Sequence, residues 1–351
     1  MTFSPQCPTP HVDAERIQLA HGEGARLSRR LIRQELLTAF ANPYLAQLAD
    51  AATLPALAGR LVLTTDGSVV SPLFFPGGDI GALAVHGAVN DLAVSGAEPL
   101  YLSVALIIEE GLPIETLRRI IASMRDAATA CGVLVVTGDT KVVPHGAADQ
   151  IFICTSGVGR LRPGVELGAH RARAGDRVLV SGDLGEHGLA VLAAREGLDL
   201  GDGLRSDTAP VHQLVAGLLE LGEAVRFLRD PTRGGVAAVL HELVEQASKE
   251  NALAVRIDES ALPIAPAARG ACELLGLDAI HIANEGKVVA VVAPAAAAAA
   301  LAALHRHPLG QRAAIIGEVI ASDAPAVLLA NRFGQLRILD EPSGAPLPRI
   351  C

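Results

Sequence analysis

Apolar residues recur along this chain at two spacings, one typical of helices and one typical of strands, and the two kinds of segment alternate irregularly. The clearest helix is predicted over residues 114–131, with Pro113 at its start and Gly132 just past its end. Further helices are predicted over residues 27–40, 83–95, 190–196, 210–221, 236–247 and 265–275. Strands are predicted over residues 60–65, 100–108, 133–136, 151–156, 177–180, 225–228 and 253–257, with two more around Ile280 and Val288. The irregular order favours an α+β fold over a doubly wound parallel sheet.

A loop rich in Gly, Arg and Pro over residues 159–175 separates the two halves of this pattern. We place the domain boundary there, which gives an N-terminal domain over residues 15–163 and a C-terminal domain over residues 170–338. The last segment, residues 339–351, contains prolines and a glycine but no apolar period, which is typical of a mobile arm. Its final residue is Cys351, which is either incidental to a frayed tail or a thiol that reaches into an active site.

The composition fits a globular protein large enough for two domains, because half of the 351 residues are apolar and 19% are charged. The 29 basic and 38 acidic residues give a net charge of −9, with no basic block and with only seven Phe and two Tyr. This argues against nucleic acid as a partner, since binding it requires clustered Lys and Arg and stacking aromatics. The longest uncharged run, residues 288–304, contains Pro294 and is too short to span a bilayer, so we expect no membrane partner.

The five cysteines are scattered without a CxxC pair, which disfavours a zinc site and fits a reducing compartment. The first residues lack the basic and apolar regions of a signal peptide. We therefore expect a cytoplasmic protein.

Among the places where a carboxylate stands next to a glycine, we expect four pairs to lie in loops between strands and helices. The pairs are Asp66-Gly67, Gly78-Asp79, Gly138-Asp139 and Gly182-Asp183. Glycine lets the backbone approach a ligand, and a carboxylate beside it can hold a hard cation that neutralises phosphate oxygens. Each pair alone is also an ordinary turn former. Four in one chain favour a site for a magnesium-nucleotide complex, with Gly138-Asp139-Thr140-Lys141 in a loop after the strand at 133–136.

Two further segments carry polar groups in helical surroundings. Asn90 and Asp91 place an amide and a carboxylate on a predicted helix. The run Arg229-Asp230-Pro231-Thr232-Arg233-Gly234-Gly235 stands at the start of another, where backbone N–H groups point at anions. Neither is a Walker loop or a dinucleotide-binding motif, so a nucleotide site built on them is of another type.

Together with Thr64-Thr65-Asp66 and the loop over residues 74–81, these motifs resemble the PurM-like superfamily of aminoimidazole ribonucleotide synthetase. Within it, the chain is most similar to the family of the hydrogenase maturation factor HypE, the carbamoyl dehydratases. The terminal Pro348-Arg349-Ile350-Cys351 is that family's own signature, and the resemblance runs from about Ile17 to the end. It implies two α+β domains, with ATP bound in the first, a dimer formed through the sheets of that domain, and residues 1–14 left as a disordered extension.

The resemblance also implies the site residues. Those that bind the nucleotide are Asp66, Gly78, Asp79, Asn90, Asp91, Gly138, Asp139, Thr140, Asp230, Thr232, Arg233, Gly234 and Gly235. Magnesium is held by Asp66, Asp79 and Asp91. The family's early glycine loop corresponds to His21-Gly22-Glu23-Gly24-Ala25, although its last position is usually a glycine.

In this family, Cys351 would accept a carbamoyl group from the carbamoyltransferase HypF, and ATP would then drive loss of water to leave a thiocyanate. Phosphorylation turns a very poor leaving group, the amide oxygen, into phosphate. Lys141 and Glu285 are the candidate bases that the resemblance suggests, with His145 close to Lys141 in sequence. The implied partners are HypF, the HypC-HypD iron-scaffold complex and a second copy of the chain.

Two other functions are compatible with the motifs. A kinase or synthetase of the same superfamily would act on a small diffusible substrate, and Cys351 would then be dispensable. A scaffold that carries a cyanide or metal fragment without turnover would need Cys351 but neither Asp79 nor Lys141.

Overall fold

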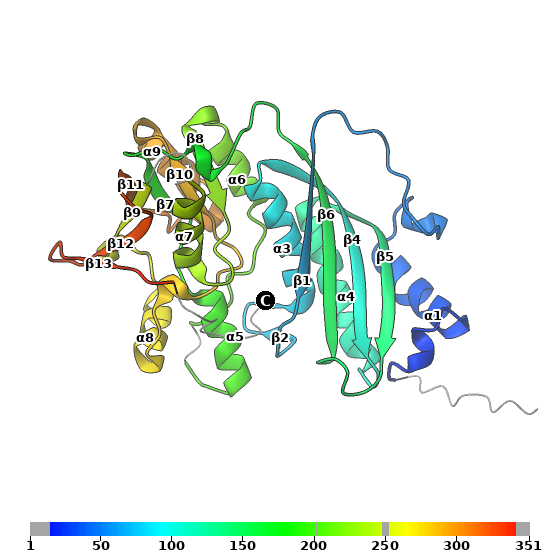
Figure 1. Cartoon of the computed structure of the whole chain (residues 1–351). Helices are drawn as coiled ribbons and strands as arrows, with labels where there is room; N and C mark the ends of the chain where they lie inside the picture. Colours follow the sequence, from blue (N-terminus) through cyan, green and yellow to red (C-terminus); the bar gives the residue numbers. More distant parts are fainter. Residues whose placement is uncertain (1–14, 201–202, 248–252, 342–351) are drawn as a thin grey trace, which may run out of the picture.

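The computed structural model describes residues 15–200, 203–247 and 253–341, which form two units of sheet and helix (Figure 1). The N-terminal unit is built on a four-stranded sheet in the order β1-β6-β4-β5. The strands are β1 (Leu61–Ser68), β4 (Ala97–Glu109), β5 (Leu134–Val143) and β6 (Ile151–Leu161). Helices α3 (Ile80–Val94) and α4 (Ile114–Cys131) cover one face of this sheet.

The two faces of the four-stranded sheet differ in what covers them. Alternate residues such as Val104, Leu106 and Ile108 of β4 are buried under the helices. On the other face, the side chains of Leu61 and Leu63 are 60% and 73% exposed. The sheet of the described chain therefore presents one uncovered apolar face, which is typical of an interaction surface.

A short helical segment lies beyond β5 at the edge of this sheet (Figure 1). It comprises α1 (Arg26–Leu31), one π-helical stretch, η2 (Ile32–Leu36), and α2 (Leu37–Ala39). Short 3₁₀ turns flank it, η1 (Leu19–His21) and η3 (Leu45–Gln47). The helix predicted over residues 27–40 is thus present, with a π-helical irregularity in its middle. A two-residue hairpin, β2 (Phe74–Phe75) and β3 (Gly78–Asp79), leads into α3.

The C-terminal unit is built on a seven-stranded sheet in the order β13-β12-β9-β11-β7-β10-β8. Its strands are β7 (Arg177–Val180), β8 (Val225–Arg229), β9 (Leu253–Asp258), β10 (Val289–Val292), β11 (Ala314–Ala321), β12 (Ala326–Ala330) and β13 (Leu336–Ile338). Its α-helices are α5 (Glu186–Glu196), α6 (His212–Leu219), α7 (Gly235–Ala247), α8 (Pro266–Leu275) and α9 (Ala297–His305). Its 3₁₀ turns are η4 (Ala169–Arg171), η5 (Gly222–Ala224), η6 (Glu259–Ala261), η7 (Ala279–His281), η8 (Pro294–Ala296) and η9 (Pro308–Gly310).

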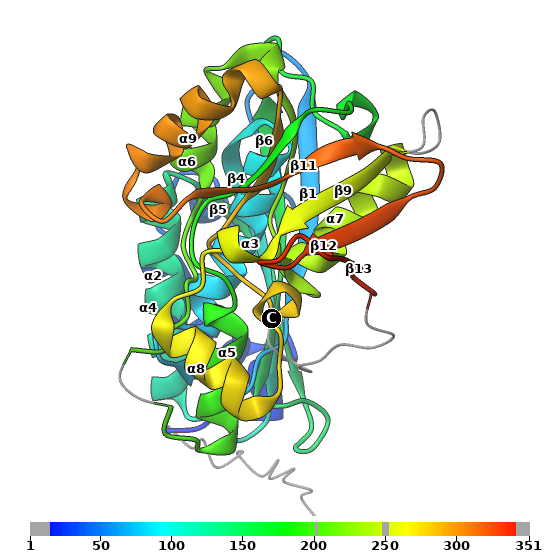
Figure 2. The same ribbon diagram turned by 90° about the vertical axis from the view of Figure 1, so that its left-hand side faces the viewer.

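Strands β7 and β10 lie in the middle of the C-terminal core and pack on both faces. Val178 and Val180 belong to the cluster that contains α7, whereas Leu179 belongs to the cluster that contains α6 and α9. Helices α6 and α9 lie side by side on that second face (Figure 2). Because both faces are covered, these strands read as continuous apolar runs in the sequence.

The mixed arrangement confirms the predicted α+β class, and most predicted elements are present. Three predictions of local structure are wrong. The pairs Asp66-Gly67 and Gly78-Asp79 lie in strands β1 and β3 rather than in loops. Residues 138–141 do not form a loop, because β5 continues in parallel register with β4, from Gly138 beside Val104 to Lys141 beside Ile107. Ile280 is not in a strand but in η7, where the Asp278 carboxylate accepts a hydrogen bond from the Ile280 N–H.

Candidate functional site

The first part of the candidate site forms where α3 packs against β1. The Thr64 hydroxyl donates a hydrogen bond of 2.6 Å to Asp91 Oδ2, and the Gly67 N–H donates one of 2.8 Å to Asp66 Oδ1. A Cβ atom at Gly87 would collide with the Asp66 carboxylate, so only glycine leaves room for it. Asp91 follows Gly87 by one helical turn, and the two predicted magnesium ligands Asp66 and Asp91 therefore lie on the same side of α3.

The C-terminal unit brings two more carboxyl groups to this place, Asp230 and Glu285. Asp230 keeps some exposed surface, but burial and then the negative charge of Asp91 raise its pKa to about 7. Glu285 is only 4% exposed, and burial, followed by the charges of Asp230 and Asp207, raises its pKa well above the ordinary value. Burial also raises the pKa of Asp91. These four acids repel one another, so a proton or a cation among them is favoured.

Glu285 is held in this cluster by its backbone rather than by its carboxyl group. Its N–H donates to Asp207 Oδ1 at 3.1 Å, and its carbonyl accepts from Asn90 Nδ2 at 3.2 Å. Its Oε1 atom is buried and has no hydrogen-bond partner within the described part of the chain. A buried oxygen without a partner is costly unless a ligand or ion completes it.

The sequence reasoning missed Asp207, Glu186 and Lys287, which form a buried ion-pair cluster beside Glu285. Lys287 Nζ lies 3.1 Å from Asp207 Oδ2 and 3.3 Å from Glu186 Oε2. Both acids raise the pKa of Lys287, against the effect of its burial. The motif Glu285-Gly286-Lys287 was the one available signal, since nothing around Asp207 in the sequence marks it.

Gly78 was expected to approach a ligand, but another part of this chain lies against it and against Gly77. A Cβ atom at Gly77 would lie 2.6 Å from the backbone N and O of Ser206, and one at Gly78 would lie 2.5 Å from a methyl carbon of Thr208. The Ser206 N–H also donates to the Pro76 carbonyl at 2.7 Å. We call residues 203–211 the strap, because this segment runs between the hairpin β2–β3 and the Glu285 loop.

Asp79 caps the start of α3, where its Oδ1 accepts hydrogen bonds from the N–H groups of Gly81 and Ala82 at 2.8 and 3.1 Å. Asp91 lies twelve residues further along the same helix, which places the two about 18 Å apart along its axis. Within one chain, the structure therefore does not bring Asp79 to Asp66 and Asp91. Its assignment to magnesium stays a prediction.

The segment from Asp230 to Gly235 connects β8 to α7. Gly234 and Gly235 have φ angles of +77° and +62°, and a Cβ atom at Gly235 would lie 2.6 Å from the Ile280 carbonyl. The Gly235 N–H donates to the Thr232 carbonyl at 2.9 Å, and Arg233 is exposed. The fold alone thus requires both glycines, and the predicted nucleotide contacts of Thr232, Arg233, Gly234 and Gly235 stay a prediction.

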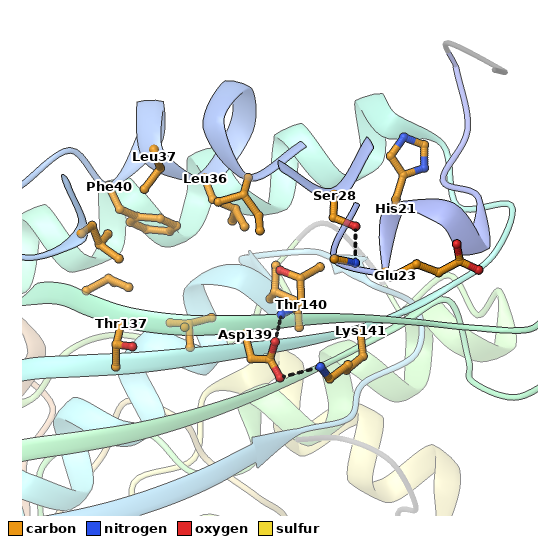
Figure 3. A pocket seen from close by; sticks show the side chains of 18 residues that line it. His21, Glu23, Ser28, Leu36, Leu37, Phe40, Thr137, Asp139, Thr140 and Lys141 are labelled. Atoms are coloured by element: carbon orange, nitrogen blue, oxygen red, sulfur yellow. Dashed lines mark hydrogen bonds and ion pairs between the residues drawn. The ribbon is translucent and has the colours of Figure 1, made fainter. Parts of the chain in front are cut away.

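A second group of predicted residues lines a cavity of about 370 Å³ between the N-terminal helical segment and β5 (Figure 3). Its apolar part includes Leu36, Phe40 and Leu106, and its polar rim combines the glycine loop at 21–24 with residues 138–141. Successive side chains of β5 alternate, so Thr140 lies on the cavity side, while Asp139 and Lys141 lie on the other side of the strand. Lys141 Nζ lies 3.2 Å from Asp139 Oδ2, and the Thr140 N–H donates to Asp139 Oδ1 at 2.8 Å.

His145 lies just after β5, with Nδ1 3.0 Å from Glu109 Oε1. The N–H groups of Gly146 and Gln150 donate to the same carboxylate at 2.5 and 2.9 Å and, with Gly146 as the largest cause, lower its pKa. In this structure His145 therefore belongs to a turn stabilised by Glu109.

The carboxyl cluster around Asp66 and Asp91 and the cavity residues of β5 lie at opposite edges of the four-stranded sheet. Asp66 is on β1 and Lys141 on β5, three strand spacings apart, which is about 14 Å or more. The structure thus does not bring Lys141 and Glu285 together within one chain. The predicted carrier Cys351 lies outside the described residues.

Magnesium fits the first group even though no three His, Cys, Asp or Glu side chains among residues 15–200, 203–247 and 253–341 are arranged to hold a metal ion. This ion usually takes one or two carboxylates and completes its shell with water and substrate phosphates. Asp66 and Asp91 can supply the two carboxylates, and the repulsion among the four acids provides the need for positive charge. None of the described helices is both long and apolar enough to cross a bilayer.

Comparison with known proteins places these features in a family. The model of the AIR synthase related protein N-terminal domain matches residues 48–161, and that of the C-terminal domain matches residues 173–329. Carbamoyl dehydratase HypE of Bradyrhizobium diazoefficiens is 51% identical over 336 residues, which cover 95% of this chain and 96% of the relative. The crystal structure of the hydrogenase maturation protein HypE in complex with ATP matches with a TM-score of 0.90 at 44% identity, over 95% of this chain and 99% of that one. A crystal structure of a HypE-HypF complex matches with a TM-score of 0.78 at 47% identity, over 89% of this chain and 99% of that one.

Proposed function

The chain belongs to the AIR synthase related family, in its HypE carbamoyl dehydratase branch, and on that premise we propose that it dehydrates a carbamoyl group carried on its own Cys351. The reaction consumes ATP and leaves a thiocyanate, which supplies cyanide ligands for the iron of [NiFe]-hydrogenase. The observation that supports it most is the carboxyl cluster at the junction of the two units, where Glu285 is buried and its Oε1 has no hydrogen-bond partner among the described residues. The ATP complex of a relative that is 44% identical supports the use of ATP.

The chemistry requires the thiocarbamate to lose oxygen and two protons. Transfer of the γ-phosphoryl group to the carbamoyl oxygen forms the new P–O bond, and the C–O bond then breaks to release phosphate. The nitrogen gives up both protons as the C≡N bond forms. The sum is thiocarbamate plus ATP giving thiocyanate, ADP, inorganic phosphate and a proton.

We assign the base to Glu285, which the resemblance suggested together with Lys141 and His145. Its burial and its acidic neighbours raise its pKa, and a carboxylate with a raised pKa accepts a proton more readily at neutral pH. Magnesium held by Asp66 and Asp91 would supply positive charge beside the phosphates of ATP.

A homodimer through the uncovered sheet face would complete the site. The exposed Leu61 and Leu63 support this interface, and Asp139 and Lys141 lie on the same side of β5 as the uncovered face. A second copy would bring its own Lys141 to the site of the first, which would unite the two groups of predicted residues. Isologous pairing of this kind is the commonest form of oligomer.

HypF is the proposed donor of the carbamoyl group, because a relative 47% identical to this chain is known in complex with it. We also propose the HypC-HypD complex as the acceptor of cyanide, on the family resemblance alone. The described cysteines Cys131, Cys154 and Cys272 are free thiols, which suits the cytoplasm as the compartment.

The direct test is the intact mass of the purified chain after incubation with HypF, carbamoyl phosphate and ATP. We expect a carbamoyl adduct that then loses one water to give the dehydrated adduct. Cys351→Ala should lose both adducts, whereas the matched variant Cys7→Ala, which removes a thiol near the other end of the sequence, should keep them.

The same experiment separates the rival functions. If the Cys351→Ala variant still consumed ATP with a free small substrate, a kinase or synthetase function would be favoured. A wild-type chain that never dehydrates its carbamoyl adduct, together with cyanide delivery that needs Cys351 but neither Asp79 nor Lys141, would favour the scaffold.

A further inference from the structure

Asn90 was expected to contact the nucleotide, yet its side chain is fully engaged elsewhere. It is 1% exposed on α3. Its Nδ2 donates to the carbonyls of Ala209 and Glu285 at 3.0 and 3.2 Å, and its Oδ1 accepts from the Val211 N–H at 2.8 Å. Both N–H bonds and the carbonyl oxygen are thus used by the backbone of the C-terminal unit. A nucleotide could reach this amide only by breaking them.

Asp91, the next residue on α3, points toward β1 rather than toward the C-terminal unit. Asp91 accepts from Thr64 on β1, beside Asp66, while Asn90 holds the strap and the carbonyl of Glu285. A helix is rigid over one residue, so the position of Glu285 is fixed relative to Asp91 through a single peptide unit.

The loop that carries Glu285 is also held from the C-terminal side. Asn284 Oδ1 accepts from the Gly185 N–H at 2.8 Å, and its Nδ2 donates to the Pro231 carbonyl at 3.2 Å. A Cβ atom at Gly286 would collide with the Asp207 carbonyl, so the loop lies directly on the strap. Among the described residues, Asn90 supplies a side-chain hydrogen bond that joins this loop to the N-terminal unit.

We infer that Asn90 is a positioning residue, which holds the Glu285 loop in register with the Asp66–Asp91 pair so that the base and the phosphoryl-transfer site share one geometry. This inference rests on the proposed function and goes beyond it by separating Asn90 from the nucleotide ligands. The amide acts through Glu285 and touches no reacting atom.

The molecule offers a matched comparison for a purely structural role. His86 lies one turn before Asn90 on α3, is also buried, and its Nδ1 lies 3.2 Å from the Thr208 hydroxyl of the strap. This bond joins the same two units, but it does not involve the Glu285 loop. Thr208→Val removes it with little change in shape, so it measures what a lost contact between the units costs by itself.

The experiment compares Asn90→Ala, Asn90→Asp and Thr208→Val in the full chain, carbamoylated by HypF and then mixed with Mg-ATP. We expect the dehydration rate of Asn90→Ala to fall at least about tenfold, while its KM for ATP stays within about twofold, because geometry is lost and nucleotide contacts are kept. Thr208→Val should keep the wild-type rate. Asn90→Asp is isosteric and keeps the acceptor for the Val211 N–H, so it carries the test if Asn90→Ala does not fold.

Three results would overturn the inference. A raised KM for ATP with an unchanged rate would make Asn90 a nucleotide ligand. An equal loss of dehydration rate in Thr208→Val would show that Asn90 acts only as a general contact between the two units. A wild-type rate in both Asn90 variants would leave it without any role in the reaction. Failure of the wild-type chain to dehydrate its carbamoyl group would instead remove the proposed function, so the two failures are distinct.

Discussion

The carboxyl cluster at the junction and the polar residues of β5 contain similar chemical groups in opposite surroundings. At the junction, Glu285 is 4% exposed, and burial raises the pKa of three of the four acids. On β5, the side chains of Lys141 and Asp139 are 64% and 61% exposed and pair with each other. The junction is electrostatically strained without a ligand, whereas the β5 pair is neutralised and solvated. Within one chain, the junction is therefore the region whose carboxyl groups are poised to bind a cation or exchange a proton.

The largest effect is expected at Glu285. Glu285→Gln should slow dehydration by about 10²- to 10⁴-fold, the range typical of losing a general base. The fold should be kept, because the amide removes one of the mutually repelling acids. The measurement is the rate of water loss from the carbamoylated chain, followed by intact mass. Glu273→Gln, an exposed glutamate on α8, is the control and should show the wild-type rate. Equal rates for both variants would contradict the assignment of the base.

The second prediction tests whether the junction of one chain and β5 of a second chain form one active site. If the site takes Lys141 from a second copy, then Asp91→Asn and Lys141→Ala should each be inactive alone, and a mixture of the two should regain roughly a quarter of the wild-type activity through mixed dimers with one intact site. The measurement is ATP-dependent dehydration after the two variants exchange subunits. Adding Leu63→Lys to both variants should abolish the recovery by breaking the uncovered face. A mixture as inactive as its components would mean that each site is built from one chain.

The strain at the junction should also appear in the pH dependence of stability. The pKa of Asp230 is about 7 in the folded chain, against an ordinary value of 3.8. Between these values the folded state keeps the proton and the unfolded state releases it, so the free energy of unfolding falls as pH rises through this window. Asp230→Asn should remove that loss, and its melting temperature relative to wild type should be higher at pH 8 than at pH 5. Asp323→Asn, at an exposed position, should show no such difference. Magnesium should reduce the effect in the wild-type chain.

The smallest effect is expected for the β5 pair. Lys141→Ala should change the free energy of unfolding by less than about 1 kcal/mol, because an exposed ion pair contributes little. Urea unfolding of the single variant gives this value. A much larger loss would mean that Lys141 has a structural role that its exposure does not suggest, and it would weaken its assignment to the reaction.

The sequence predicted most helices and strands, because their periodicity records which face is buried. It failed at β5, where Gly138, Asp139 and Thr140 have loop-like composition and pair with β4 all the same. That pairing is a contact between distant segments, which local composition does not record. The strap could not be predicted for the same reason, since nothing in the sequence reveals that Ser206 and Thr208 pack on Gly77 and Gly78.

The motifs identified residues that matter but not which of them act together. Asp66 and Asp91 lie close enough to interact electrostatically, whereas Asp79 caps α3 and Asn90 binds the C-terminal unit. Asp66 and Asp79 both stand next to a glycine, and Asn90 stands next to Asp91, so the local sequence does not separate their roles. The direction of a side chain and its neighbours in space decide its role, and both depend on how the helix packs.

The strap has a consequence for motion. Its backbone lies against Gly77 from the N-terminal hairpin and against Gly286 from the Glu285 loop, with no space for a methyl group on either side. Moving the two units apart would break the packing at Gly77 and the hydrogen bond from the Ser206 N–H to the Pro76 carbonyl, so we expect the junction to stay closed during turnover. A substrate carried on Cys351 would then have to reach Glu285 without the two units moving apart.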